Sequence, residues 1–326
     1  MANADVMNTS KLIIPDSYLP KIYQKISENA VIPSLIPQTP KLYNLSDIIY
    51  LDTKPVTQYV QPVEGGEKET TDAGFDSREM KKFKLQTTIR LTEDMVWANE
   101  DNSATDDQLD VIFDAMTASL GEGVDAGMIH QFDPHTKGLV TDAASVALAK
   151  VGTQVNVTGN LQSDMDSLPD PLLKAGFNAS GIALDTMYAN ELRKLRNNDG
   201  MRLYPEVPLK VNTMGNFEGL DAVVSGNVSG RSFKGLGDTG VKAIIGQWDM
   251  AQWGIIREMA LRRFDVGDPD NRGYDLAYKN EVAYRVEMVF AFGLVYDDAF
   301  AVLRDGSTAT QSAPADTDEP KATRSK

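Results

Sequence analysis

Residues 47–91 constrain the fold more than any other part of the chain, because they form two extended runs around a glycine-containing tip. The run over 83–91 alternates apolar and polar residues, a pattern typical of a β-strand with one buried face. The run over 49–60 carries apolar residues at Ile49, Leu51, Val56 and Val60, although Pro55 interrupts it. With about 15 residues per arm at ~3.3 Å each, the hairpin would reach about 50 Å. An isolated ribbon is marginally stable in water, so we expect it to complete its packing on another copy of the chain.

The tip of this hairpin is mostly acidic, and basic side chains follow it along the return arm. Complementary charge between subunits sets the register of an interface more than its affinity. We therefore predict inter-subunit contacts at the tip and base of the hairpin, from Glu64, Gly65, Gly66, Glu67, Lys68, Arg78, Lys81 and Lys82.

Composition bounds the possible functions of the chain. At 326 residues it exceeds a typical single domain, and 42% hydrophobic residues suffice for two compact bodies with extensions. A net charge of -15 disfavours binding to a phosphate backbone as the main task. The absence of cysteine excludes disulfides and thiolate metal sites. We find no secretory signal and no apolar run long enough to cross a membrane.

The two ends of the chain differ from its middle. Residues 1–46 are predicted to form an arm that lies against something else, with one short helix between Pro20 and Pro33, because prolines recur throughout this segment. Residues 305–326 lack any periodicity and are predicted to be disordered.

A long helix is predicted after the hairpin, over 106–129. Thr105 and Gln108 match a capping box, and apolar residues then recur at helical spacing. Three glycines in its second half weaken the helix, and would permit a bend or a close neighbour.

The remaining elements mix helices and strands. A helix over 161–175 should break at two prolines, and a strand over 181–184 should lead to a helix capped by Asp185. Further strands are predicted over 221–224, 241–245, 253–261 and 300–303, and an unusually long one over 282–294.

Catalytic chemistry is weakly represented. His130, Asp133 and His135 lie close in sequence, but Pro134 breaks the helical spacing, so a loop at a helix end is favoured over a metal site. The glycine pattern at 235–240 lacks the strand before it and the helix after it that a dinucleotide site needs, so it is interpreted as a flexible loop. We predict no catalytic residue, no cofactor and no metal, and hence no enzyme.

The order of these parts resembles the major capsid proteins of tailed bacteriophages, which share the Hong Kong 97-type fold. The segments that carry the resemblance are Val63–Lys68 with Thr71, Asp72 and Phe75; Arg90–Asp94; Leu184–Leu195 with Asn198–Tyr204; Gly219–Ser225; and Glu281–Val286 through Asp298–Leu303. Each motif is weakly specific, whereas their order and spacing together are much more so.

The resemblance implies an α+β chain with a peripheral domain, containing a long spine helix and long strands, and an axial domain with a central sheet flanked by helices. The expected boundaries are an N-terminal arm at 1–46, an extended loop at 47–91, a peripheral domain at 92–160 with its spine helix at 106–129, an axial domain at 161–279, return strands at 280–304 and a tail at 305–326.

The resemblance also implies a function. The chain would assemble as hexamers and pentamers into the icosahedral head of a tailed phage, would form in the bacterial cytoplasm and would enclose double-stranded DNA without reading its sequence. Expected partners are a separate scaffolding protein, a portal and a decoration protein, with no membrane. Some family members form a lysine–asparagine cross-link, but the spacing of Lys68, Lys81 and Lys82 relative to Asn271 and Asn280 singles out no pair.

Two alternatives stay open from the sequence. An encapsulin-like bacterial nanocompartment shell would keep the fold and enclose an enzyme instead of DNA. An α/β enzyme with an unrecognised site would be a different class of protein altogether.

Overall fold

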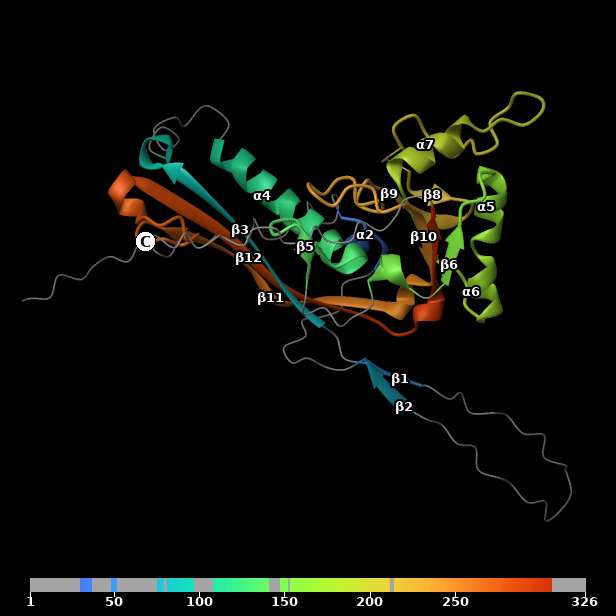
Figure 1. The fold of residues 1–326 in the computed structure, drawn as a ribbon, viewed down its shortest axis with the longest axis horizontal. Helices are drawn as coiled ribbons and strands as arrows, with labels where there is room; N and C mark the ends of the chain where they lie inside the picture. The colour runs from blue at the N-terminus through green and yellow to red at the C-terminus, as the bar shows by residue number, and fades with distance from the viewer. Residues whose placement is uncertain are drawn as a thin grey trace, which may run out of the picture.

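The structure, a computed structural model, describes residues 30–36, 48–51, 75–78, 81–96, 108–140, 147–151, 153–211 and 214–306. One end of the described part holds a long three-stranded sheet with a helix along it, and the other end holds a second sheet with shorter helices (Figure 1). Helices and strands are therefore mixed, as the sequence predicts. No helix in these ranges is long and apolar enough to cross a membrane.

The long sheet is built around β12 (Glu281–Leu294), which pairs with β11 (Ala251–Phe264) on one side and with β3 (Lys81–Thr92) on the other. Both pairings are antiparallel. The predicted strand over 282–294 is thus confirmed, and its apolar side chains are buried because it is the central strand. In β11 the register shifts on both sides of Arg257, the residue that interrupts the apolar pattern in the sequence.

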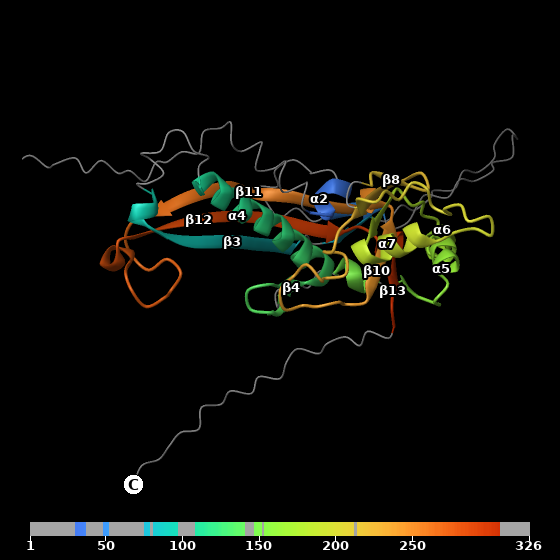
Figure 2. The same ribbon diagram turned by 90° about the horizontal axis from the view of Figure 1, so that it is seen from above.

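Helix α4 (Gln108–Asp125) lies along one face of the long sheet (Figures 1 and 2). The helix and sheet come close at Gly123, where an added Cβ would lie 3.1 Å from Leu85 Cδ1. At Gly127 an added Cβ would lie 3.9 Å from the rings of Phe83 and Phe290, which stack with centroids 5.1 Å apart. The close neighbour expected for the glycines of this helix is therefore a strand of the sheet.

The end of α4 departs from regular helix. Residues Ala126–His130 form a π-helical turn, and Gln131 then takes a left-handed conformation with φ 54°. The predicted helix over 106–129 is confirmed from 108 onward. Its first residues and the capping box at Thr105 lie outside the described residues.

The pairing predicted for the hairpin is wrong for residues 83–91. These residues belong to β3 and pair with β12, whereas the paired part of the ribbon is β1 (Ile48–Leu51) against β2 (Phe75–Arg78). The alternation of 83–91 correctly indicates a strand with one buried face, but such a pattern does not identify the partner strand. The β1–β2 ribbon projects away from both sheets (Figure 1).

The second sheet contains six strands in the order β6-β13-β10-β7-β9-β8. Its strands are β6 (Thr153–Asn156), β7 (Gly181–Leu184), β8 (Asn216–Phe217), β9 (Leu220–Val224), β10 (Val241–Gly246) and β13 (Phe300–Arg304). Helices α5 (Leu161–Ser167), α6 (Asp170–Lys174) and α7 (Thr186–Lys194) pack beside it (Figure 1). The predicted break between two helices, and the cap that Asp185 places on α7, are both confirmed.

Sheet membership differs from the domain boundaries expected at 160, 279 and 304. β11 lies in the long sheet, although the expected boundaries place it in the axial domain, whereas β13 pairs with β10 of the expected axial segment and β6 pairs with β13. The chain crosses between the two sheets at two short turns, η4 (Trp248–Met250) and η6 (Asp297–Ala299). These turns are too short to mark a domain boundary in the pattern of apolar residues, so the sequence did not reveal them.

The N-terminal segment contributes a short helix, α2 (Ile32–Leu35), that is packed into the core. Val31, Ile32 and Ile36 are almost completely buried. Pro33 stands in the first turn of α2, where proline is tolerated because its missing N–H would have no helical partner there. The helix predicted between Pro20 and Pro33 lies outside the described residues.

Gly246 allows the chain before η4 to lie close to the chain after η6. An alanine at this position should therefore destabilise the subunit. Its Cβ would meet the ring of Phe300 and lie 2.9 Å from the carbonyl oxygen of Ala299. We expect Gly246→Ala to lower the free energy of unfolding by ~1–3 kcal/mol, as overpacking does. Urea denaturation of unassembled subunits measures this. Gly215→Ala is the matched control, because its Cβ would meet nothing within 4 Å; equal midpoints for the two variants would contradict the expectation.

Candidate assembly site

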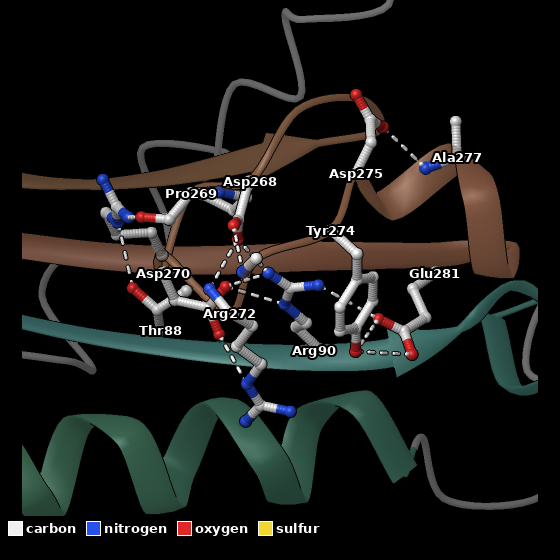
Figure 3. Close-up of polar contacts among 12 residues, drawn as sticks. Thr88, Arg90, Asp268, Pro269, Asp270, Arg272, Tyr274, Asp275, Ala277 and Glu281 are labelled. Carbon is white, nitrogen blue, oxygen red and sulfur yellow. Dashed lines mark hydrogen bonds and ion pairs between the residues drawn. The ribbon is translucent and has the colours of Figure 1, made fainter. Parts of the chain in front are cut away.

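Arg90 connects β3 to the loop between β11 and β12, residues 265–280. Its side chain is only 3% exposed, and its Nη2 lies 2.5 Å from Asp268 Oδ1. The same guanidinium forms an ion pair with Asp270, and its Nη1 lies 3.3 Å from Glu281 Oε2. Figure 3 shows these carboxylates converging on Arg90 from the loop and from the start of β12. The planar guanidinium spreads five donors over a rigid fork, a geometry that contacts several carboxylates at once and that the compact ammonium of lysine lacks.

Tyr274 completes this arrangement, which we call the Arg90 clamp. The guanidinium carbon of Arg90 lies 4.6 Å from the centre of the Tyr274 ring, and Lys279 Nζ lies 3.9 Å from it. The Tyr274 hydroxyl donates to Glu281 Oε2 at 3.1 Å (Figure 3). Both the cation–π contact and the hydrogen bond of Tyr274 therefore hold the loop against the long sheet.

Bonds within the loop fix its backbone as well. The Asp268 carboxylate accepts from the backbone N–H groups of Arg272 and Gly273, and Asp275 caps the short helix η5 (Leu276–Lys279). Arg285 of β12 donates to the carbonyl oxygen of Pro269. The hydrogen bond from Arg90 lowers the pKa of Asp270, so this ion pair persists to lower pH than it would with an ordinary aspartate.

The loop that the clamp fixes presents apolar side chains to solvent. Val266 is 69% exposed and Tyr278 is 84% exposed, whereas Leu276 between them is buried. A rigid loop loses little conformational entropy when it binds, so this end of the long sheet is preorganised for contact with another surface.

A group of charged side chains from β3 and β12 lies on the other face of the long sheet, away from α4. Lys84 of β3 lies 3.6 Å from Glu287 of β12, and Arg285 lies 3.8 Å from the same carboxylate. Lys82 is exposed two residues before Lys84 and so projects on the same side. This face therefore carries exposed positive charge at one edge strand.

The predicted contact residues fall in different places. Lys81 and Lys82 lie in β3 opposite Phe292 and Ala291 of β12, and Arg78 ends β2 opposite Ile48. The tip residues Glu64, Gly65, Gly66, Glu67 and Lys68 lie outside the described residues. The structure thus places two of the lysines in the sheet and Arg78 in the ribbon.

Sequence reasoning missed the Arg90 clamp. The sequence offered a weak signal only, because Arg90 lies in phase with the other polar residues of the alternating run and two aspartates flank Pro269. No local pattern links Arg90 to Asp270, which is 180 residues away, however. Their ion pair becomes visible only when the fold places β3 beside β12.

The segments that carry the two histidines and the glycine pattern are a helix end with the turn after it, and a loop. His130 ends the π-helical turn, and its Nε2 lies 2.9 Å from the carbonyl oxygen of Asn227. Within the described ranges no group of acidic residues and histidines could hold a metal ion. Residues 235–240 form a loop, with left-handed φ angles at three glycines.

Comparison with known proteins identifies the class of this chain. Residues 11–305 match the phage capsid family. The chain belongs to that family. None of the curated proteins matches it. Among solved structures, one from Mycobacterium phage Ogopogo is 27% identical, with a TM-score of 0.72 over 85% of this chain and 92% of the other.

Other structures show the same fold. A structure from Gordonia phage Cozz is 25% identical, with a TM-score of 0.70 over 85% of this chain and 86% of the other. The capsid of an empty GTA particle computed with C5 symmetry is 13% identical, with a TM-score of 0.58 over 86% and 90% of the two chains, and supports the fold alone. As a member of the phage capsid family, the chain is a structural protein of a phage shell and assembles with copies of itself.

Substitution of Arg90 should release the loop over 265–280 from the long sheet. In Arg90→Lys the compact ammonium lacks the planar fork that spans the three carboxylates, so we expect the amide hydrogens of 265–280 to lose most of their protection from exchange. Hydrogen–deuterium exchange measures this. Lys84→Ala is the control, because Lys84 is 57% exposed and its ion pair with Glu287 contributes little. Unchanged protection in Arg90→Lys would contradict the role of the clamp.

Proposed function

We propose that this chain is the major capsid protein that builds the icosahedral head of a tailed bacteriophage. Copies form hexamers and pentamers that close around double-stranded DNA, assembled in the bacterial cytoplasm with a separate scaffolding protein, a portal and a decoration protein. The observation that carries the proposal is the β1–β2 ribbon, which projects from the body of a phage capsid family member (Figure 1). A two-stranded ribbon needs another surface to be stable, and a neighbouring copy supplies it.

The extended loop is proposed to work through its charge. Its tip carries Glu64, Glu67 and Glu69, and the exposed lysines Lys82 and Lys84 stand on the polar face of the long sheet. An acidic tip on one copy complements this face on the next, which fixes the register of many weak contacts. The net charge of -15 also suits a container whose wall does not bind its DNA tightly.

The same family membership is compatible with an encapsulin-like shell that holds an enzyme. The contents of purified particles separate the two, because a phage head copurifies with DNA and a nanocompartment with a cargo protein. In our proposal the chain is not an enzyme, and a catalytic role gains support only if the purified chain stays monomeric at high concentration.

Negative-stain microscopy of the recombinant protein tests the proposal. Closed shells or ring-shaped capsomers are the expected result, with the scaffolding protein supplied where shells do not close unaided. Uniform small particles across a range of salt, concentration and scaffold conditions would contradict it.

Charge reversal at the tip should block assembly without unfolding the subunit. We expect Glu64→Lys with Glu67→Lys to abolish closed shells, because the tip would then repel Lys82 and Lys84 of the neighbouring copy. Sedimentation velocity measures the fraction of protein in assembled shells, and circular dichroism verifies that the variant subunit is folded. Asp166→Lys with Glu218→Lys is the control, since it changes the net charge equally at exposed positions on the six-stranded body. Equal loss of assembly in both pairs would overturn the role of the tip.

A further inference from the structure

A buried carboxylate stands where three distant segments of the chain meet. Asp125 is the last residue of α4 and is 0% exposed. Its Oδ2 accepts from the backbone N–H of Val31 at 2.8 Å and from Asn227 Nδ2 at 2.7 Å, and its Oδ1 accepts from the backbone N–H of Ile32 at 3.1 Å. The N-terminal segment, the long helix and the loop after β9 thus share one side chain.

Other contacts show that this place is a seat for residues 30–36. Trp253 of β11 donates its indole N–H to the carbonyl oxygen of Ile36 at 2.9 Å. Val31, Ile32 and Ile36 enter the same apolar core as Trp253 and Met128. No side chain caps α2 from within its own segment. The first free N–H groups of this segment therefore depend on Asp125, a residue more than ninety positions away.

We propose that Asp125 is a latch that seats residues 30–36 of the N-terminal arm on the joint between the long helix and the loop after β9. The joint lies between the two sheets, since α4 runs along the long sheet and β9 belongs to the six-stranded sheet. Seating therefore requires both bodies to hold their relative position. The latch fixes the position of residues 30–36 within one subunit, so it does not rest on the proposed function.

The polar groups around Asp125 define how the latch responds to protons. Residues 30–36 carry no ionisable side chain. Glu122 on α4 faces Asp125, and His130 on the π-helical turn contacts Asn227, with Lys150 and Arg304 beyond it. Burial lowers the pKa of His130 to about 4, so it stays neutral between pH 5 and pH 7. Burial also raises the pKa of Glu122, so both carboxyl groups gain protons more readily than usual as the pH falls. Of the two, Asp125 is the one that accepts hydrogen bonds from Val31 and Ile32.

Seating strengthens as the solution becomes mildly acidic. Burial raises the pKa of Asp125 from 3.8 to about 6, although the three donors offset part of this effect. A carboxyl group whose pKa is raised by seating takes up a proton when the arm seats. The contribution of Asp125 protonation to seating is therefore fully present below its ordinary pKa of 3.8 and is lost as the pH rises through about 6. For a released carboxyl with its ordinary pKa, seating at pH 5 is about tenfold more favourable than at pH 7.

Hydrogen–deuterium exchange on the full-length unassembled chain tests the latch. Protection factors correct for the intrinsic pH dependence of exchange, and those of Val31 and Ile32 report the seat directly. We expect them to be about tenfold higher at pH 5 than at pH 7, measured relative to β12. Asp125→Asn should reduce them at both pH values by about tenfold or more, because its amide group faces a donor, and should remove the pH dependence.

The controls make each outcome decisive. Asp114→Asn makes the same change at an exposed position of α4 and should behave as the unmodified chain. Unchanged protection of residues 31 and 32 in Asp125→Asn, or a pH dependence that persists in it, would overturn the proposal. If that variant fails to fold, the unmodified chain still decides the matter: a ratio to β12 that is equal at pH 5 and pH 7 would overturn the latch.

Discussion

The backbone pairing of β12 is the interaction on which the rest of the structure depends. This strand pairs along both of its edges, and its apolar side chains form a continuous surface against which α4 packs. It also continues through η6 into β13, so the same stretch of chain enters the six-stranded sheet. At that junction Trp248 meets Phe300 edge to face, with ring centroids 5.4 Å apart. The two sheets are thus connected by short, packed crossings instead of a linker.

Two polar side chains hold segments that the backbone hydrogen bonds of the sheets do not hold. Arg90 holds the loop at the far end of the long sheet, and Asp125 holds the N-terminal segment at the joint between the sheets. Each contact joins positions distant in sequence and replaces water around buried or half-buried charges with specific donors or acceptors. A shell subunit needs such fixed surfaces, because weak contacts repeated among many copies add up only when their geometry is reproducible.

The sequence predicted most of the elements and few of their partners. The alternation over 282–294, the cap at Asp185 and the prolines at 169 and 171 gave correct local structure, because each signal acts within a few residues. The partner of residues 83–91 was wrong, since side-chain alternation is the same whichever strand lies alongside. The Arg90 clamp and the seat at Asp125 were not foreseen, because both are pairings between segments that only the tertiary fold brings together.

The family and the shell function followed from the order of weak motifs, a property of the whole chain that no single residue carries. The central claim is that the ribbon at β1 and β2 serves a neighbouring copy. A cryo-electron microscopy map of assembled particles, clear enough to trace residues 47–80, tests this most directly. The account predicts that this segment lies against a different subunit. Density showing it folded onto the long sheet of its own subunit would contradict it.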